Sequence, residues 1–453
     1  MRKTIAFLIL ILSFQIHAED GEISFGVASV DITPREPIRL NGFSKRIQPS
    51  NGVIDPLYAR ALAIRDNQQR TALIITLDLL TIDKYIADRI SDYVKKRYRI
   101  PRERIMINAS HTHTGPVIFN SASDISPLNE EETEVARKYT ELLETKIYGI
   151  VDKAMASLVP GLLKYGVGSA EFASNRREYS TTGLKFGLNP FGPVDSDVPV
   201  LAIYSKSNGL SAVVFGYACH PVTYGGSLNI SADYPGFARK YIEMVYPEVM
   251  TFFIQGCAGE INPSPKNNSK WAKSHGMELA GAVLSVVSKE MLTISPELNC
   301  NFQEIALEVE HIPTKSELDS TIENTPDEIG RSAQIIRQAK KFRRMIENGE
   351  DIPKEYQYPI QVWKFGKDFT WIALGSEVTV DYSIRLKHEI TGNCWVSAYT
   401  NDVRGYVSSV RLLLEGGYES DLAIVYYGLP YRWKLDTEEK IISTVHQLRN
   451  ELK

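Results

Sequence analysis

Two hydrophobic patterns alternate along the chain. Short continuous apolar runs predict buried strands, and they lie at 72–77, 105–107, 199–204, 212–217, 250–254, 371–374 and 395–398. Apolar residues at three- or four-residue spacing predict amphipathic helices, and such segments lie at 82–94, 132–158, 235–246, 267–290, 378–389 and 436–452. Strands that alternate with helices predict an α/β fold in which helices cover the faces of a mixed sheet.

The 453 residues contain no Pro/Gly/Ser-rich stretch that would serve as a linker between two domains. We therefore expect residues 19–453 to form a single domain, since large α/β units often reach this length. Residues 315–350 are strongly charged with helical periodicity, and we interpret them as a helical excursion on the surface of that domain.

The first eighteen residues have the features of a secretory signal peptide. Arg2 and Lys3 form a basic start, residues 5–14 are apolar, and Ala18 ends an acceptable cleavage site. The apolar run is too short to span a bilayer. The sequence thus predicts a signal peptide at 1–18, a secreted or periplasmic protein, and no transmembrane segment.

Charge and cysteine content exclude two classes of protein. The net charge is −4 without a basic stripe, which argues against a nucleic-acid partner. The four cysteines, Cys219, Cys257, Cys300 and Cys394, show no C-x-x-C spacing, which excludes a zinc ribbon. Cys219 and Cys257 follow apolar runs, so their strands are expected to be neighbours. A disulfide and buried free thiols are both compatible with this pattern.

His111 and His113 follow the apolar run at 105–107 and precede Gly115-Pro116. In an extended strand, residues two apart point the same way, so both imidazoles would leave the strand end together. His-x-His is a frequent source of transition-metal ligands. A polar strand end with two chance histidines is the alternative, although the chain has only eight histidines.

The strands that follow end in further polar residues. His220 lies between the run at 212–217 and a proline, and Asp233 begins the next helix as either an N-cap or a metal-site residue. Glu260 follows the run at 250–254 in a glycine-containing turn, where it is either functional or a solvated acid. Because ligand sites in open α/β sheets lie at strand carboxyl ends, these segments predict one site.

The C-terminal half repeats this arrangement. Glu377 follows the strand at 371–374, and Tyr406 follows the strand at 395–398. The two could complete a site with the histidines, although a helix-start carboxylate and a packed loop aromatic are the ordinary roles of such residues. The remaining histidines after residue 18 are expected at surface or boundary positions: His275, His311, His388 and His446.

Taken together, these segments resemble the neutral (alkaline, non-lysosomal) ceramidase superfamily over roughly residues 24–430. The similar motifs are Gly26–Pro34, Asn41–Ser44, Asn108–Pro116, Cys219–Pro221, Gln255–Pro263, Gly375–Glu377 and Gly405-Tyr406. The resemblance implies a catalytic zinc held by two histidines, a glutamate and a tyrosine. The matching ligands here are His111, His220, Glu377 and Tyr406.

The resemblance also implies roles beside the zinc. His113 is expected to transfer a proton, while Arg176 and Tyr406 are expected to stabilise the oxyanion, with Arg176 also binding the substrate. Glu260 and Asn262 match the substrate loop of the family, but Asn262 stands where family members have serine, and Glu260 where they have aspartate. We also expect no counterpart of the immunoglobulin-like C-terminal domain of true ceramidases. These departures predict a substrate more polar than ceramide.

We therefore expect an exported zinc-dependent hydrolase that cleaves a linear N-acyl amide in a sphingolipid, an N-acyl glycolipid or an N-acyl sugar. The partner would be that small-molecule lipid or glycan, and a contact with a membrane surface is compatible with a lipid substrate. The aromatic stretch at 418–433 would line an acyl channel or pack in the core. A zinc O-deacylase (esterase) and a non-catalytic homologue that binds lipid or glycan are the alternatives.

Overall fold

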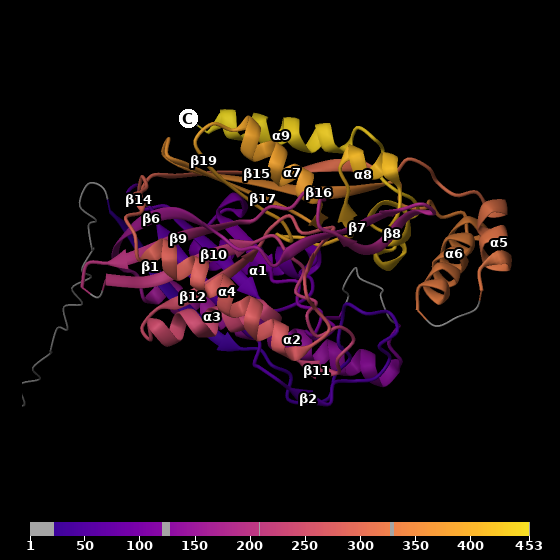
Figure 1. Ribbon diagram of the computed structural model, residues 1–453, viewed down its shortest axis with the longest axis horizontal. Coiled ribbons are helices and arrows are strands. Elements are labelled where there is room, and N and C mark those ends of the chain that lie inside the picture. Colours follow the sequence, from indigo (N-terminus) through magenta and orange to yellow (C-terminus); the bar gives the residue numbers. More distant parts are fainter. Residues whose placement is uncertain (1–21, 120–126, 208, 327–329, 453) are drawn as a thin grey trace, which may run out of the picture.

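The computed structural model describes residues 22–119, 127–207, 209–326 and 330–452, and its elements form four layers (Figure 1). A nine-stranded sheet and a four-stranded sheet pack face to face, and helices cover the outer face of each. The predicted α/β fold with a mixed sheet is therefore confirmed. The predicted signal peptide at 1–18 lies outside the described residues and stays a prediction.

The larger sheet contains most of the strands that the apolar runs predict. Its order is β12 (Met250–Gln255), β10 (Gly209–Tyr217), β9 (Asp197–Ser205), β6 (Val159–Ser169), β1 (Ile23–Asp31), β3 (Tyr58–Arg65), β4 (Thr71–Leu77) and β5 (Ile105–Ala109), with β14 (Leu292–Thr293) beside β6. The pairs β4–β5 and β10–β12 are parallel, and the others are antiparallel.

The two edges of this sheet approach each other. β5 and β12 are in contact, and the Asn108 side chain accepts a hydrogen bond from the Gln255 backbone N–H at 3.0 Å. The Asn108 amide also donates to the Ala398 carbonyl at 2.7 Å. Asn108, Gln255 and Ala398 lie at or just beyond the carboxyl ends of three strands. The buried Asn108 side chain therefore connects these three strand ends by hydrogen bonds.

The smaller sheet has the order β15 (Leu298–Glu308), β16 (Glu355–Phe365), β17 (Phe369–Leu374) and β19 (Asn393–Ser397). Its apolar face packs on the larger sheet through buried tryptophans, and the rings of Trp371 and Trp395 stack with centroids 4.1 Å apart. The apolar runs at 371–374 and 395–398 predict β17 and β19. No continuous apolar run marks β15, because most of its side chains are only half-buried.

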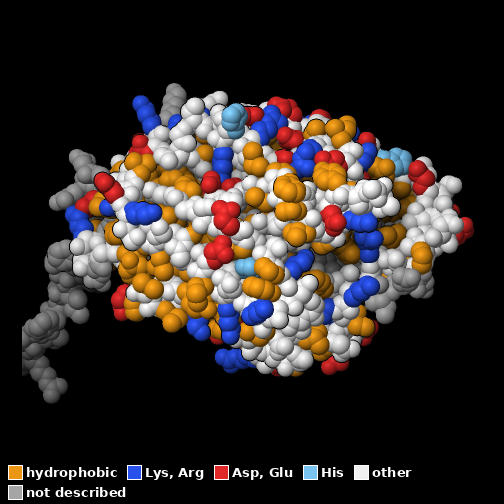
Figure 2. Space-filling view, in the orientation of Figure 1, with side chains coloured by type: hydrophobic (Ala, Val, Ile, Leu, Met, Phe, Trp, Pro, Cys, Tyr) orange, Lys and Arg blue, Asp and Glu red, His pale blue; other side chains and the backbone are white. Residues whose placement is uncertain are grey.

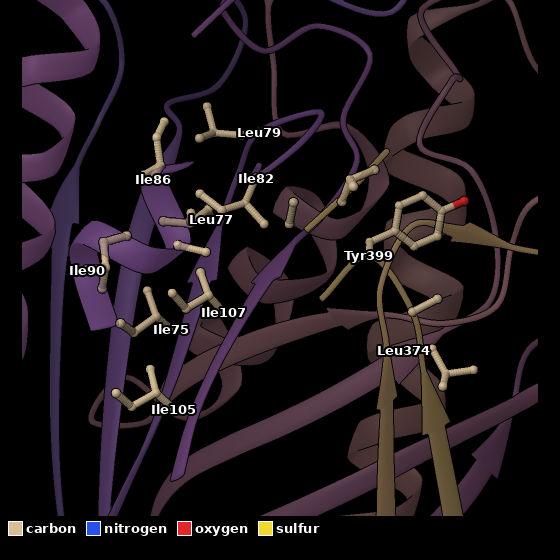
Figure 3. Close-up of a cluster of buried hydrophobic side chains, with 14 of the residues drawn as sticks. Ile75, Leu77, Leu79, Ile82, Ile86, Ile90, Ile105, Ile107, Leu374 and Tyr399 are labelled. Carbon is tan, nitrogen blue, oxygen red and sulfur yellow. The ribbon is translucent and has the colours of Figure 1, made fainter. Parts of the chain in front are cut away.

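The predicted helices are present with ends shifted by a few residues. On the larger sheet they are α1 (Lys84–Tyr98), α2 (Glu130–Ala156), α3 (Asp233–Val245) and α4 (Ser269–Val287), and on the smaller sheet α7 (Val380–Glu389) and α9 (Thr437–Glu451). Apolar residues four positions apart on α1 pack on the sheet. Figure 3 shows Ile86 and Ile90 of α1 against Ile75 of β4 and Ile107 of β5. The Asp83 carboxylate caps α1 by accepting from the Ile86 N–H.

The helical excursion expected at 315–350 appears as α5 (Lys315–Asn324) and α6 (Arg331–Glu347), which lie together at one end of the molecule (Figure 1). A small hydrophobic cluster of their own holds the two helices together. α6 also contacts a short 3₁₀ helix, η3 (Ile424–Tyr427), and the Gln338 side chain donates to the Leu429 carbonyl at 2.8 Å. The excursion therefore supports the loop that carries Tyr427.

All four cysteines are free thiols, and Cys219 and Cys257 are buried after the neighbouring strands β10 and β12. His388 is exposed as expected, but the expectation for His275 was wrong. His275 is buried on α4, where it stacks on Phe172 and bonds to the Pro265 carbonyl. No helix in the described ranges combines the length and apolar character needed to cross a membrane.

Candidate metal centre and substrate cavity

A cavity of about 190 Å³ opens where the strand ends meet. It contains predicted site residues from both halves of the sequence, with the exception of Glu260, and several residues that the sequence did not single out. Its main polar and aromatic lining residues are His111, His113, Arg176, Phe186, His220, Asn262, Lys266, Glu377, Tyr406, Tyr418, Tyr426 and Tyr427.

His111 and His113 reach this cavity by a different route from the one expected. β5 ends at Ala109, and His111 adopts a left-handed backbone conformation with φ 65° instead of continuing the strand. Such a conformation is costly for a residue with a side chain, and here the His111 N–H is held by the Leu79 carbonyl at 2.9 Å. The prediction that both imidazoles share one site is confirmed, since their Nε2 atoms are 3.2 Å apart.

Backbone carbonyls orient all three imidazoles in the same way. Nδ1 of His111 lies 2.8 Å from the Leu80 oxygen, Nδ1 of His113 lies 3.1 Å from the Gly42 oxygen, and Nδ1 of His220 lies 2.7 Å from the Ala258 oxygen. A carbonyl oxygen only accepts, so each Nδ1 must carry the proton. In the neutral ring, Nε2 then presents a lone pair to the cavity, as in histidines that ligate metals.

Glu377 joins the histidines through a short pair of strands. β18 (Glu377–Val378) and β20 (Tyr406–Val407) are parallel, and Glu377 lies directly opposite Tyr406. The Glu377 Oε2 atom is 3.1 Å from Nε2 of both His111 and His220. Its Oε1 atom accepts a hydrogen bond from the Tyr427 hydroxyl. Both carboxylate oxygens are therefore engaged, one by a donor and one by two imidazole nitrogens.

We call His111, His113, His220 and Glu377 the acceptor cluster. Burial and neighbouring charges lower the pKa of His113, and burial with Arg176 lowers the pKa of His220 to about 4, so both are neutral. Burial would raise the pKa of Glu377, but the imidazoles outweigh it and the pKa lies well below the usual value. Inward lone pairs beside a carboxylate repel one another, and a cation removes that repulsion.

The donor set fits a metal ion on chemical grounds. The three imidazole nitrogens lie within 4.8 Å of one another, and nitrogen and carboxylate oxygen are ligands that zinc prefers. The histidines and the glutamate are buried or nearly so. Each imidazole Nδ1 donates to a backbone carbonyl, and Glu377 accepts from the Tyr427 hydroxyl. The predicted ligands His111, His220, Glu377 and Tyr406 thus line one cavity.

Arg176 lies beside Tyr406 on the cavity wall. It projects from β7 (Ala173–Ser180), and its Nη2 donates to the Tyr406 hydroxyl at 3.1 Å. The guanidinium carbon is 4.8 Å from the Phe186 ring centroid and 5.3 Å from that of Tyr418. Arg176 is therefore held by aromatic faces on two sides, which favours a fixed orientation for a cation.

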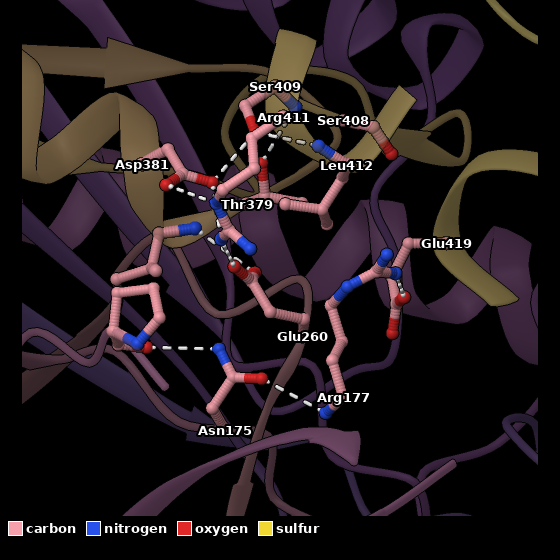
Figure 4. Close-up of polar contacts among 12 residues, drawn as sticks. Asn175, Arg177, Glu260, Thr379, Asp381, Ser408, Ser409, Arg411, Leu412 and Glu419 are labelled. Atoms are coloured by element: carbon pink, nitrogen blue, oxygen red, sulfur yellow. Dashed lines mark hydrogen bonds and ion pairs between the residues drawn. The ribbon is translucent and has the colours of Figure 1, made fainter. Parts of the chain in front are cut away.

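A buried carboxylate fixes the other end of the same guanidinium. Glu419, in a π-helical turn, η2 (Tyr418–Leu422), accepts from Arg176 Nε at 2.9 Å and from Arg177 Nη1 at 2.6 Å. Figure 4 shows Arg177 and Glu419 side by side. The residue pattern of 418–422 contains no signal for this role, because the ion pairs join segments more than two hundred positions apart.

The two predicted substrate-loop residues occupy different places. Asn262 lies on β13 (Ile261–Pro263), next to β7, and its Oδ1 accepts from Arg176 Nη1 at 3.4 Å. Glu260 (Figure 4) is buried but does not line the cavity, and its Oε2 accepts from the Val380 N–H at 3.1 Å. Burial raises the pKa of Glu260 to about 8.

Asp233 also lies outside the cavity lining. Ala232 is the N-cap of α3, and the buried Asp233 carboxylate accepts from the Thr223 N–H at 2.9 Å and from the Thr223 hydroxyl. Because Thr223 follows His220 by three residues, Asp233 braces the loop that carries this histidine. Asp233 is therefore not the N-cap of α3, and its contacts support the loop of the candidate metal site.

Comparison with known proteins completes the description of the site. The sequence profile of the family described as neutral/alkaline non-lysosomal ceramidase, N-terminal, matches residues 23–281. The chain belongs to this family. The matched range holds His111, His113, Arg176, His220 and Asn262, whereas Glu377 and Tyr406 lie beyond it.

Individual ceramidases are similar to this chain at low identity. A neutral ceramidase of Pseudomonas aeruginosa is 24% identical over 274 residues, which cover 57% of this chain and 39% of that protein. The chain thus aligns with about two fifths of the length of this curated relative. The solved structure of a ceramidase complexed with C2 has a TM-score of 0.71 at 17% identity, covering 96% of this chain and 76% of that one. The crystal structure of neutral ceramidase from Pseudomonas aeruginosa has a TM-score of 0.69 at 19% identity, covering 96% and 75%.

Proposed function

We propose that this protein is a zinc-dependent amide hydrolase that cleaves linear N-acyl amines, ceramide-type lipids included. The acceptor cluster is the observation that carries the proposal. Three imidazole Nε2 atoms and a carboxylate oxygen lie next to one another, and a bound divalent cation is the simplest way to balance them. Membership of the ceramidase family supports amide cleavage as the reaction.

We assign His111, His220, Glu377 and Tyr406 as the ligands. Zinc in such a site supplies a water activated at neutral pH and a Lewis acid for the scissile carbonyl. Tyr427 holds the free oxygen of Glu377, and the Leu80 and Ala258 carbonyls hold the two ligating imidazoles. These outer contacts orient the ligands before the metal binds.

His113 is the residue that we assign to proton transfer. Its Nδ1–H is held by the Gly42 carbonyl, so Nε2 is free to accept a proton and to return it to the departing amine. Amide cleavage requires this step, because an amide anion is a very poor leaving group. A histidine next to the ligands but not among them therefore suits an amide better than an ester.

Arg176 and Tyr406 line the same cavity as the acceptor cluster. The guanidinium donates to the Tyr406 hydroxyl at 3.1 Å, so the two donors are held next to each other. Developing negative charge on the substrate oxygen would be stabilised by such fixed donors. Because Arg176 is already oriented by Glu419 and aromatic rings, little reorganisation accompanies the reaction.

A substrate panel on the purified mature chain tests the proposal. N-acyl ethanolamine, short-chain ceramide, an N-acyl sugar and a matched O-acyl ester would be assayed for fatty-acid release, before and after chelation and zinc addition. Zinc-restored release from amides is expected. Release from the ester alone would favour the O-deacylase, and binding without release would favour the non-catalytic homologue. N-terminal sequencing of exported protein tests the proposed start near Glu19.

A further inference from the structure

Two hydrogen-bond donors at the cavity lack acceptors. Asn262 is 5% exposed, and its Nδ2 has no partner, although its Oδ1 is engaged by Arg176. Lys266 forms no ion pair with a carboxylate in the described ranges, and its Nζ lies 5.5 Å from the Phe186 ring centroid. A buried donor without an acceptor is costly, and Asn262 Nδ2 is such a donor. Lys266 is half-buried and adds a positive charge beside it.

The same two residues border a second space. A cavity of about 440 Å³ shares Phe186, Asn262 and Lys266 with the cavity of the acceptor cluster, and Asn175 and Ser264 line its far side. The two cavities meet at Asn262 and Lys266. A substrate whose amide lies at the acceptor cluster would therefore place the adjoining group next to these two donors.

The charge around this region is positive, although the chain carries a net charge of −4. A third cavity adjoins Arg176 and Phe186 and adds Lys185 and Arg331 to its lining. Figure 2 shows several Lys and Arg side chains near the place where Figure 1 draws β7 and β8 (Gly183–Asn189). The carboxylates lining the three cavities, Glu377 and Glu419, are already engaged by Tyr427, the imidazoles and the two arginines.

We propose that Asn262 and Lys266, the donor pair, bind an anionic group on the amine-derived part of the substrate. The preferred substrate would then be an N-acyl amine that carries a carboxylate, sulfonate or phosphate near the amide. The amine-derived part is the one that carries the anion, because a linear acyl chain has no acceptor for an amide N–H and an ammonium group. This inference rests on the proposed amide hydrolysis and adds the charge of the substrate.

The departure from the family motif supports the assignment. Asn262 stands where the resembling motif has serine, and its side chain offers an N–H that a serine would not place as far into the cavity. Burial and the nearby Arg176 lower the pKa of Lys266. An anion bound between the two cations would offset this repulsion.

Matched ligands that differ only in charge test the proposal. N-dodecanoylglycine and N-dodecanoyltaurine carry an acid, and N-dodecanoylglycinamide is their neutral counterpart. Calorimetric binding to the zinc-loaded chain should be at least about tenfold tighter for the acids, since hydrogen bonds to charged groups are the stronger ones. Lys266→Met should reduce this preference about tenfold or more. Lys270→Met, an exposed residue on the same segment, should leave it unchanged.

The outcomes separate this inference from the proposed function. Equal binding of acids and amide by the parent chain, or an unchanged preference in Lys266→Met, would overturn the donor pair. Hydrolysis is measured in parallel with the same compounds. Preferential binding of the acids without hydrolysis of any compound would leave the donor pair standing and contradict the amide hydrolase. Equal affinity for the sulfonate and the carboxylate would show that the donor pair recognises the negative charge and not the shape of one acid.

Discussion

The acceptor cluster and the donor pair line the same cavity but suit groups of opposite charge. In the acceptor cluster, imidazole nitrogens and a carboxylate oxygen face one another at 3.1–3.2 Å, an arrangement that a cation would balance. At the donor pair, a buried amide N–H without a partner and a half-buried ammonium group line the cavity, and an anion would accept from both. The contrast indicates a substrate held between a metal ion at its carbonyl and cationic donors at its amine part.

The two regions are also built differently. The acceptor cluster is fixed by backbone carbonyls, a tyrosine hydroxyl and strand pairing, all of which are in place without a ligand. The donor pair has one member on a paired strand, Asn262, and one on the loop after it, Lys266. We therefore expect substitutions in the cluster to abolish the chemistry and substitutions at the pair to change substrate choice.

The largest effect is expected from removing a ligand. His111→Ala or His220→Ala should eliminate most bound zinc and lower amide hydrolysis by more than about a thousandfold, since even an outer-contact change costs about 10–100-fold. Elemental analysis and initial rates measure both quantities. His388→Ala, which removes an exposed histidine on α7, serves as the control. Full zinc occupancy in His220→Ala would remove this histidine from the ligand set.

His113→Ala separates chemistry from metal binding. The variant should keep most zinc while turnover falls by about 10²–10⁴, the usual loss for a general acid or base. The measurement is kcat for an N-acyl amine at equal zinc occupancy, compared with an activated ester that needs no protonation of its leaving group. If His113→Ala lost zinc as completely as His111→Ala, all three histidines would be ligands and the division of roles would be wrong.

Sequence and structure agree on the cluster because its residues are marked by local patterns. His111, His220 and Glu377 each follow an apolar run that becomes a strand, as does Tyr406 beside the cluster, and the resemblance to a family then implies that these four hold a metal. The left-handed backbone of His111 could not be predicted, because the Leu79 carbonyl that holds it belongs to a neighbouring loop. The alternation expected between His111 and His113 failed for the same reason.

The support of the site was harder to predict. Tyr427 and Glu419 act through contacts with residues fifty or more positions away, and their own segment shows only an aromatic-rich composition. β15 and β7 were missed because half-buried strands lack continuous apolar runs. Lys266 has no distinguishing spacing, and only the cavity around it shows that its charge lacks a partner.

Tyr427→Phe sharpens the account of the cluster. Losing the hydroxyl that donates to Glu377 should weaken zinc binding by about 10–100-fold, as is typical of outer contacts to a ligand. Competition with a chromophoric chelator measures the affinity, and Tyr431→Phe, an exposed tyrosine nearby, is the matched control. Unchanged affinity would mean that Glu377 is held sufficiently by its strand pairing with Tyr406.

The smallest effect concerns the orientation of Arg176. Glu419→Gln should lower kcat/KM about tenfold, because a charge-assisted hydrogen bond to the guanidinium becomes a neutral one. In an Arg176→Met background the same change should have little further effect, since the group that Glu419 orients is gone. Circular dichroism before assay checks that both chains fold. Equal losses in both backgrounds would show that Glu419 acts on stability rather than through Arg176.

The central claim is that the acceptor cluster is built for a catalytic cation. The most direct test is to measure the zinc content, melting temperature and N-acyl amide hydrolysis of one preparation, as purified, after chelation and after zinc addition. We predict about one zinc per chain, loss of hydrolysis and a lower melting temperature on chelation, and recovery of both with zinc. Full hydrolysis and an unchanged melting temperature in zinc-free protein would contradict the account.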